Sequence, residues 1–574
     1  MELIAGFKEI FPNETLLSLH QYCQGASRNW LLHASCHIAG FRLHNSKFEK
    51  YDDFISMWFR PNNHEFAQQV YNRCCAFEKE RGPFRIVNPI ASLTLFEFVY
   101  GLPHQEQTIP EETVEINLFK AYLSSSDDWI VRETAGLASV KNVNEDLRTA
   151  AHYLLASFYK HELLNTDLLK SAITQYLKAE CLFDFLSTYD EKTKHLLSRF
   201  LEYYECVDSI EYFKKILPLF SILFAVDKKE GDTRVSITRD EHFEIGCRFF
   251  DKLSLIETGE IKDDDFSVIR AFPFYKIPGE KGEYRIIYDL FVIDKIFRGL
   301  YFKLKELHDA KDYSIDKKFK DFRGYIYCDR FSEKYLLANV LNKIAAGNYF
   351  AVSEDDAIRI GIAKSAPDFY LRKDNAILIF ESKDVLIKKR VKQSFDYLEI
   401  TEEMKHQFAG KAISQLVGNI RRILIHDWPI DTGIVLETVR IYPVLVTHYE
   451  TFNASGLNYI LNYWFQEELD KLRQEGLNIS CVLPLVCMDI DTLIYFQDIF
   501  REEKAIEVAI QEYLKFVHLV PTKILLPTEL LIKYKEESNY PFSYYLRKEI
   551  EKLDKEFKGP KAFLELVKRL EPKN

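Results

Sequence analysis

The sequence lacks the signatures of several common enzyme classes. No Gly-x-x-x-x-Gly-Lys-Ser/Thr phosphate loop, no Gly-x-Ser-x-Gly nucleophile elbow and no His-Glu-x-x-His zinc motif occurs in its 574 residues. Its ten cysteines form no Cys-x-x-Cys pair, which argues against zinc ribbons and thioredoxin-like redox sites. We therefore interpret the cysteines as buried free thiols.

Long apolar runs are also missing. The longest, Ile216 to Val226, is far shorter than the ~20 residues that a membrane-spanning helix requires. The first residues, Met1 to Phe11, contain acids and no cationic stretch, so they do not resemble a signal peptide. These features predict a soluble, cytoplasmic protein with no membrane partner.

An excess of positive charge is absent as well. The chain has 76 Lys and Arg against 87 Asp and Glu, a net charge of -11, so a nucleic acid would need a local basic surface. The composition, 47% hydrophobic and 28% charged, is typical of a globular protein. A chain of this length is too long for one core, and we expect two to four domains.

Hydrophobic periodicity predicts a multidomain chain: a large, mostly α-helical N-terminal region followed by an α/β core. The expected regions are 1–227 (α-helical), 228–324 (a connecting module), 325–450 (the α/β core) and 451–574 (a C-terminal extension of that core). In the first region we expect helices at Leu147–Leu163, Asp167–Thr188 and Lys192–Phe213. In the second we expect a β-hairpin of Arg270–Ile277 and Tyr284–Val292, then a helix at Asp294–Leu307.

The α/β core is predicted in more detail. Its expected helices are Ser332–Ile344 and Lys405–Ile425, and its expected strands are Ala357–Ile362, Pro367–Leu371, Ala376–Lys383 and Val439–Thr447. The C-terminal region should add a helix at Leu457–Glu475 and a strand at Ile479–Val486. This series alternates helices and strands as an α/β unit does.

Charged residues interrupt the apolar pattern of one expected hairpin. Asp368 opens the first strand, and Glu381 and Lys383 end the second on the face that Ile377 and Ile379 also occupy. Burying such charges is costly unless they are paired or bind a metal ion. Carboxylate oxygens are the ligands that hard divalent cations prefer, so the pattern predicts a divalent-cation site.

The series Pro367-Asp368, Glu381-x-Lys383 and a preceding helical acid, Glu333, resembles the PD-(D/E)XK nuclease superfamily over roughly 120 residues. The resemblance implies a restriction-endonuclease-like α/β fold, with a mixed central sheet flanked by helices. The resemblance further implies Mg²⁺ or Mn²⁺ held by Asp368, Glu381, the Ser382 backbone carbonyl and Glu333. It also implies a catalytic role for these three acids and Lys383. Glu333 lies four residues before Leu337, so the helical period places it on the inward face.

Basic residues gather after this motif. From 383 to 422 there are nine Lys and Arg against five Asp and Glu, a local charge of +4. We expect Lys411, Gln415 and Arg422 on one face of the helix after the motif, where they could contact a phosphate backbone. Lys388, Lys389 and Arg390 extend the candidate nucleic-acid surface, although an ordinary amphipathic surface helix explains the same pattern.

The favoured hypothesis is a metal-dependent endonuclease that hydrolyses DNA, with a role in restriction or antiviral host defence suggested by analogy. RNA cleavage by the same fold is an alternative. A further alternative is a non-catalytic interaction or sensor protein whose α/β region is structural. The helical N-terminal region would suit a protein partner, and a homodimer stays open.

Overall fold

The computed structural model describes residues 3–40, 51–159, 161–224, 233–255, 266–311, 318–360, 366–519, 534–552 and 559–570. It divides into two compact units. Unit 1 comprises Met1–Ala135, Leu163–Leu168 and Ile210–Gly299, and unit 2 comprises Gly136–Glu162, Leu169–Ser209 and Leu300–Asn574. These units do not follow the four regions expected from the sequence, and the expected boundary at 227/228 lies outside the described residues.

Unit 1 is mostly helical. Its helices are α1 (Phe7–Ile10), α2 (Leu19–Cys23), α3 (Arg28–Ala39), α4 (Tyr51–Trp58), η2 (Pro61–Asn63), α5 (His64–Arg81), α6 (Pro89–Tyr100), α7 (Glu111–Ala138), α12 (Ser209–Phe224), α13 (Phe243–Asp251), α14 (Ser267–Ala271) and α15 (Asp289–Asp294). Helix α9 (His161–Asn165) and helix α16 (Arg298–Asp309) each cross a boundary between the units.

Two small sheets complete unit 1. Strands β1 (Leu3–Ile4) and β2 (Phe84–Arg85) pair with each other, and a four-stranded sheet has the order β3-β6-β5-β4. Its strands are β3 (Arg234–Ser236), β4 (Ser254–Leu255), β5 (Phe274–Lys276) and β6 (Glu283–Ile286). The antiparallel pair β5–β6 confirms the expected hairpin, but its strands are shorter, because α14 and α15 take up the outer ends of the predicted segments.

Unit 2 is built on a mixed five-stranded sheet with the order β11-β10-β9-β8-β7. Its strands are β7 (Phe350–Ser353), β8 (Phe369–Lys373), β9 (Ala376–Lys383), β10 (Arg440–Thr447) and β11 (Val486–Asp489). Strands β7, β8 and β9 are antiparallel neighbours, whereas β9, β10 and β11 run parallel. The sequence anticipated β9 with the same bounds and β10 to within one residue.

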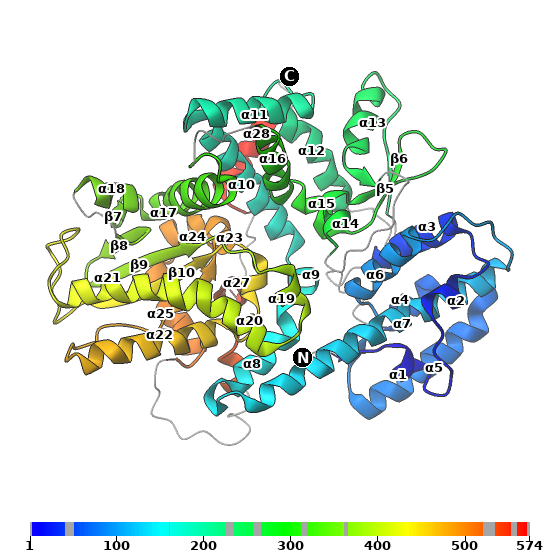
Figure 1. Ribbon diagram of the computed structural model, residues 1–574, viewed down its shortest axis with the longest axis horizontal. Helices are drawn as coiled ribbons and strands as arrows, with labels where there is room; N and C mark the ends of the chain where they lie inside the picture. The colour runs from blue at the N-terminus through cyan, green and yellow to red at the C-terminus, as the bar shows by residue number, and fades with distance from the viewer. Residues whose placement is uncertain are drawn as a thin grey trace. The chain divides into compact units, whose positions relative to one another are not determined.

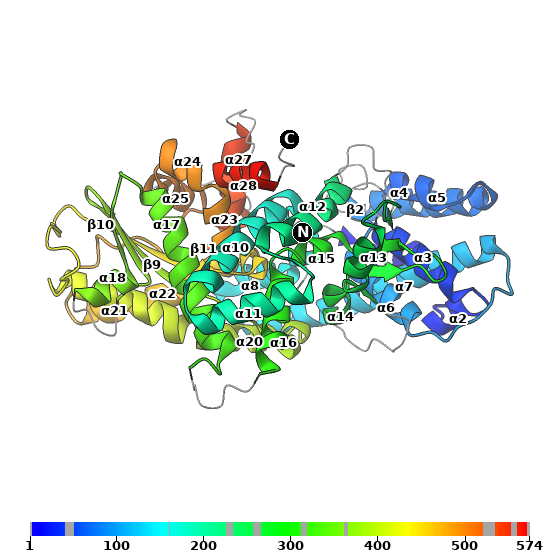
Figure 2. The same cartoon turned by 90° about the horizontal axis from the view of Figure 1, so that it is seen from above.

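Helices cover both faces of this sheet. One face carries Tyr370, Ile379 and Leu445, which pack in one core with residues of α21 (Ser414–Leu424) and α22 (Leu457–Gln474). The other face is covered by α17 (Leu337–Ala345), which contacts α23 and α24, and Figure 1 shows α17 and α21 on opposite sides of the strands. Figure 2 shows α17 close to α24. The sheet and its two helical layers confirm the expected α/β architecture with a mixed central sheet.

The remaining helical segments of unit 2 surround this centre. They are η3 (Ser139–Asn142), α8 (Glu145–Phe158), α10 (Leu168–Thr188), α11 (Glu191–Tyr203), the π-helical segments η4 (Phe322–Leu336) and η5 (Lys405–Ile413), α18 (Glu354–Arg359), α19 (Lys389–Gln393), α20 (Tyr397–Met404), η6 (Glu450–Asn453), α23 (Ile490–Tyr495), α24 (Gln497–Glu502), α25 (Ile506–Phe516), α27 (Phe542–Lys552) and α28 (Lys561–Leu570). Segment η4 continues into α17, and η5 continues into α21, so each expected long helix of the core is a π-helical part followed by an α-helical part.

The strand expected at Ala357–Ile362 is wrong over residues 357–359, which belong to helix α18. Ser353 caps this helix by accepting a hydrogen bond from the backbone N–H of Asp356, and three acids fill the first turn. Residues 361 and 362 lie outside the described residues. Strand β7 precedes the helix instead, so the sheet gains its edge strand from residues that were not predicted as a strand.

Two other expected elements also differ. The single helix expected at Lys192–Phe213 is two helices, α11 and α12, because Glu205 between them adopts a left-handed φ of 55°. The strand expected at Ile479–Val486 is regular only from Val486, although Val482 forms an isolated bridge with Ile441 of β10. Between the bridge and β11, the backbone N–H of Leu485 donates to the side chain of Asn462 on α22 and not to a strand neighbour. Among the described residues, no helix combines the length and the apolar character needed to cross a membrane.

Candidate active site

Asp368 and Glu381 face each other at one end of the sheet in unit 2. The β8–β9 ladder pairs Phe369 with Phe380, and the next antiparallel pair in this register would be Asp368 and Glu381. Directly opposite residues project their side chains to the same face of a sheet. That face also carries Tyr370 and Ile379 of the core with α21, so both carboxyl groups lie on the side covered by η5 and α21.

Hydrogen bonds fix the motif residues individually. The Ser382 backbone N–H donates to Asp368 Oδ2 at 2.6 Å, and Lys383 Nζ donates to Glu381 Oε1 at 2.8 Å. Glu381 is 0% exposed, and its second oxygen, Oε2, has no hydrogen-bond partner. A buried carboxylate oxygen without a donor is costly, so Glu381 Oε2 is a place where a cation would be stabilised.

Ser382 is held from two sides. Because the N–H and C=O groups of one strand residue point toward the same neighbouring strand, its carbonyl faces the Asp368 side together with the N–H. The Ser382 hydroxyl lies 2.7 Å from Nε2 of the buried His448, just beyond β10. The backbone at the centre of the motif therefore has little freedom to rotate.

A pocket of about 690 Å³ opens beside the motif. Four residues that were expected in the site, Glu333, Lys383, Lys411 and Gln415, line this one pocket, although they come from η4, β9, η5 and α21. The other lining residues are Asp384, Val385, Gln407, Gly410, Ser414 and Gly418. The polar face predicted for the helix after the motif thus faces the site, while Leu416 and Ile420 are buried in the core.

Three further candidate nucleic-acid residues, Lys388, Arg390 and Arg422, are not part of the pocket lining. Lys388 is exposed and bonded to Glu403 at 3.0 Å, and Arg390 is exposed. Arg422 is paired with Asp427 at 3.4 Å on the α21 side. The side chain of Lys389 lies outside the described part of the structure. Of the five whose side chains the structure describes, Lys411 and Gln415 lie at the pocket.

Burial dominates the electrostatics of the acids. It raises the pKa of Asp368 from 3.8 to about 6, against the opposing effects of Lys383 and the Ser382 N–H. Burial and the nearby Asp368 raise the pKa of Glu381 well above its ordinary value. Burial also raises the pKa of Glu333 from 4.5 to about 8, although Lys383 opposes the shift. The three carboxyl groups therefore form one interacting cluster.

Lys383 is the cation at the centre of this cluster. Burial favours its neutral form, but the carboxylates of Glu381, Asp368 and Glu333 outweigh burial and raise its pKa. Its ammonium is therefore charged at neutral pH and available as a donor at the pocket.

The sequence did not reveal two residues behind the motif. Asp384 directly follows Lys383 and lines the pocket, and Arg323 bonds to it at 2.5 Å from η4. The position of Asp384 after a buried strand was a usable signal, because most buried acids need a partner. Nothing in the sequence indicates that Arg323 is that partner, since 61 residues separate the two.

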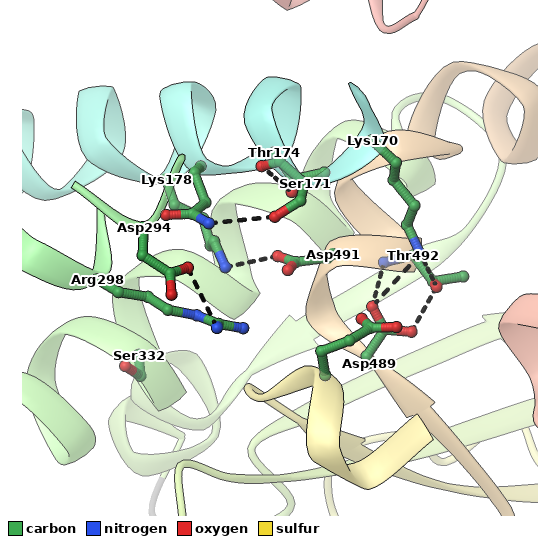
Figure 3. Close-up of polar contacts among 12 residues, drawn as sticks. Lys170, Ser171, Thr174, Lys178, Asp294, Arg298, Ser332, Asp489, Asp491 and Thr492 are labelled. Atoms are coloured by element: carbon green, nitrogen blue, oxygen red, sulfur yellow. Dashed lines mark hydrogen bonds and ion pairs between the residues drawn. The ribbon is translucent and has the colours of Figure 1, made fainter. Parts of the chain in front are cut away.

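A second charged cluster, drawn in Figure 3, lies at the same end of the sheet, where Asp489 of β11 is in register with Thr447 of β10 and Lys383 of β9. There, Lys170 and Lys178 reach from α10 toward the segment that joins β11 to α23. Lys178 pairs with Asp491 at 2.6 Å, and Lys170 Nζ lies 3.7 Å from Asp489 and donates to Thr492 at 2.9 Å. Each buried aspartate in this cluster has a lysine partner.

Within the described residues, no three carboxylate, imidazole or thiol groups converge closely enough to form a metal centre by themselves. Comparisons of the chain with protein-family models, with curated proteins and with solved structures give no match.

Proposed function

We propose that this protein is a divalent-metal-dependent nuclease of the PD-(D/E)XK type that hydrolyses phosphodiester bonds in DNA. The proposal depends above all on one observation. Asp368, Glu381 and Lys383 meet at the end of two neighbouring strands, beside a pocket that Glu333, Lys411 and Gln415 also line.

The order of elements supports the resemblance seen in the motif. Helical segment η4–α17, the antiparallel strands β7, β8 and β9, and helical segment η5–α21 follow one another along the chain, and β10 then runs parallel to β9. Both motif strands lie in the interior of the sheet, and the helix with the polar face lies over their charged ends. This is the helix, hairpin and helix arrangement that the motif requires.

The charges support a divalent cation. Because metal ligands bind in their deprotonated form, a bound ion would keep Asp368, Glu381 and Glu333 ionised with three negative charges, of which Lys383 offsets one. The remaining excess of two matches the charge of Mg²⁺ or Mn²⁺. The oxygens that fit such an ion are those of Asp368, the unpartnered Glu381 Oε2 and the Ser382 carbonyl, with Glu333 near by. Two carboxylates and one backbone carbonyl would suffice as the protein ligands of this ion, so a third converging side chain is not required.

The residues of the chain have distinct proposed roles. A bound divalent ion supplies a Lewis acid for the phosphate and lowers the pKa of a water molecule. Lys383 donates a hydrogen bond from a charged ammonium beside Glu381, where it stabilises negative charge that develops on the phosphate. Lys411 and Gln415 line the far side of the pocket, where they bind and orient the nucleic-acid backbone.

The test is an assay of the purified full chain with supercoiled plasmid, linear DNA and RNA, in Mg²⁺, in Mn²⁺ and in EDTA. We expect metal-dependent cleavage of DNA that is lost in Asp368→Asn and Lys383→Ala. Asp374→Asn is the matched control, because Asp374 is exposed in the turn between β8 and β9 and lies away from the pocket. Cleavage that survives both site variants contradicts the assignment, and preferential cleavage of RNA selects the alternative substrate.

A further inference from the structure

Asp384 is a buried acid at the pocket whose hydrogen bonds all lead to one neighbouring segment, η4. Its side chain is 2% exposed. Oδ1 accepts a hydrogen bond from Arg323 Nη2 at 2.5 Å, and Oδ2 accepts one from Ser332 Oγ at 2.6 Å. Its backbone carbonyl accepts from the same Arg323 nitrogen at 2.9 Å. Both carboxylate oxygens are therefore engaged within the protein.

Arg323 makes further contacts besides its ion pair with Asp384. Its Nη1 donates to the hydroxyl of Tyr449 at 3.2 Å, and Tyr449 follows the end of β10. Its guanidinium also lies over the rings of Tyr301 and Tyr327, 5.1 and 5.5 Å from their centroids. A planar guanidinium that donates to Asp384 and Tyr449 from two nitrogens and also stacks on two rings has few alternative positions. Arg323 thus ties η4 to the ends of β9 and β10.

The two ends of this connection are next to proposed catalytic residues. Ser332 directly precedes Glu333 on η4, and Asp384 directly follows Lys383 at the end of β9. The Ser332–Asp384 hydrogen bond therefore joins the residues that neighbour Glu333 and Lys383. Both of these side chains line the pocket, and their charges interact.

We propose that Arg323, Asp384 and Ser332 form a positioning device that holds Glu333 against Lys383 and the proposed metal ligands. The inference rests on the proposed nuclease function and assigns roles to three residues outside its motif. Asp384 acts as a hydrogen-bond acceptor for η4. Arg323 and Ser332 engage both carboxylate oxygens of Asp384, so the three residues act through Glu333 and not as metal ligands. Hydrogen-bonded partners behind metal ligands commonly change metal affinity or activity about 10–100-fold when they are removed.

Ser332→Ala is the sharpest perturbation, because it removes one hydrogen bond and leaves the Arg323–Asp384 ion pair intact. We expect kcat for metal-dependent DNA cleavage to fall about tenfold or more, and the half-saturating Mn²⁺ concentration to rise, while KM for DNA stays unchanged. Ser254→Ala is the matched control, because Ser254 is a buried serine with a single 2.7 Å hydrogen bond and lies in unit 1. Its kcat should equal that of the wild type.

Testing Ser332→Ala in a Glu333→Gln background separates a positioning role of Ser332 from a general loss of stability. In Glu333→Gln protein, Ser332→Ala should have no further effect on kcat, because its action on Glu333 is already lost. An equal loss in both backgrounds overturns the inference. If Ser332→Ala fails to fold in a thermal denaturation check, Arg323→Lys carries the same test, since it keeps the charge and loses the planar group that donates to both Asp384 and Tyr449.

The outcomes also separate this inference from the proposed function. Wild-type protein that shows no metal-dependent cleavage overturns both. Active wild-type protein with a Ser332→Ala variant that matches Ser254→Ala in kcat and in Mn²⁺ dependence overturns the positioning role alone.

Discussion

Replacing Asp368 by asparagine should stabilise the metal-free protein while it abolishes cleavage. Asparagine keeps an oxygen that accepts the 2.6 Å hydrogen bond from the Ser382 N–H, and it removes the charge beside Glu381. Most substitutions of buried, hydrogen-bonded residues destabilise proteins. A gain in stability here would therefore be a distinctive result.

The magnitude follows from the raised pKa. Burial raises the pKa of Asp368 from 3.8 to about 6, and at neutral pH such a shift corresponds to a cost of about 3 kcal/mol for keeping the carboxylate ionised. Part of this cost is shared with Glu381, so we expect Asp368→Asn to gain about 1–3 kcal/mol at pH 7 in EDTA.

The sign of the pH dependence is determined by the same shift. Because the folded-state pKa of Asp368 lies above the unfolded-state value, the folded protein binds this proton more tightly. The stability of the wild type should therefore fall as the pH rises from about 4 to about 6 and remain lower above that range. The advantage of Asp368→Asn should be close to zero near pH 4 and largest above pH 6.

Urea denaturation followed by tryptophan fluorescence, at pH 4, 5, 6 and 7 in EDTA, measures the effect. Asp489→Asn is the matched comparison. Asp489 is buried at the same end of the sheet, but Lys170 and the hydrogen bonds from Thr492 hold its pKa below the ordinary value despite burial. That variant should lose about 3 kcal/mol, since it leaves Lys170 without its carboxylate. A destabilised Asp368→Asn, or a gain that does not change with pH, refutes the reasoning.

Three further outcomes are expected. Gly418→Ala should stabilise the fold by about 0.5–1 kcal/mol in urea denaturation, because an added Cβ meets nothing within 4 Å, whereas Gly418→Leu should block the pocket and weaken DNA binding. Lys411→Ala should lower the slope of log K against log salt by about 1 in a DNA-binding titration, and Lys568→Ala on α28 should leave it unchanged. Mg²⁺ should raise the melting temperature of the wild type but not that of Asp368→Asn, and equal shifts contradict the assigned ligand.

Strand β9 could be predicted because its apolar run is long and is interrupted only by the charged residues of the motif, whereas β8 begins at Phe369, two residues after the expected start at Pro367. The run Ala376–Lys383 ends in Glu381 and Lys383, and the structure gives β9 the same bounds. The polar face of the following helix was also visible in its period, and Lys411 and Gln415 do line the pocket. In both cases the signal is local, since neighbours within one turn or one strand determine it.

The wrong or missing predictions have two different physical causes: a local signal that was not used, and tertiary contacts that leave no local signal. A capping signal was present at α18, where Ser353 precedes three acids, but it was not used for the segment Ala357–Ile362. No local signal existed at Leu485, because its N–H is bonded by Asn462 of a preceding helix. The same holds for Arg323 and Asp384, whose pairing depends on the tertiary fold. Long-range polar pairs of this kind are invisible to periodicity.

The two charged clusters at one end of the sheet provide an internal comparison. Asp489 and Asp491 each have a lysine partner, as expected for buried acids with a structural role. At the ends of β8 and β9, by contrast, Asp368, Glu381 and Glu333 all interact with Lys383, and the pKa of each acid is raised. Both clusters are buried at the same end of the sheet, so burial alone does not explain why the pKa of Asp489 is lowered and those of Asp368, Glu381 and Glu333 are raised. The cluster of Asp368, Glu381 and Glu333 holds more negative than positive charge, destabilises the metal-free fold and lies beside a pocket. Selection for stability alone would remove such a cluster, so its presence favours a functional role.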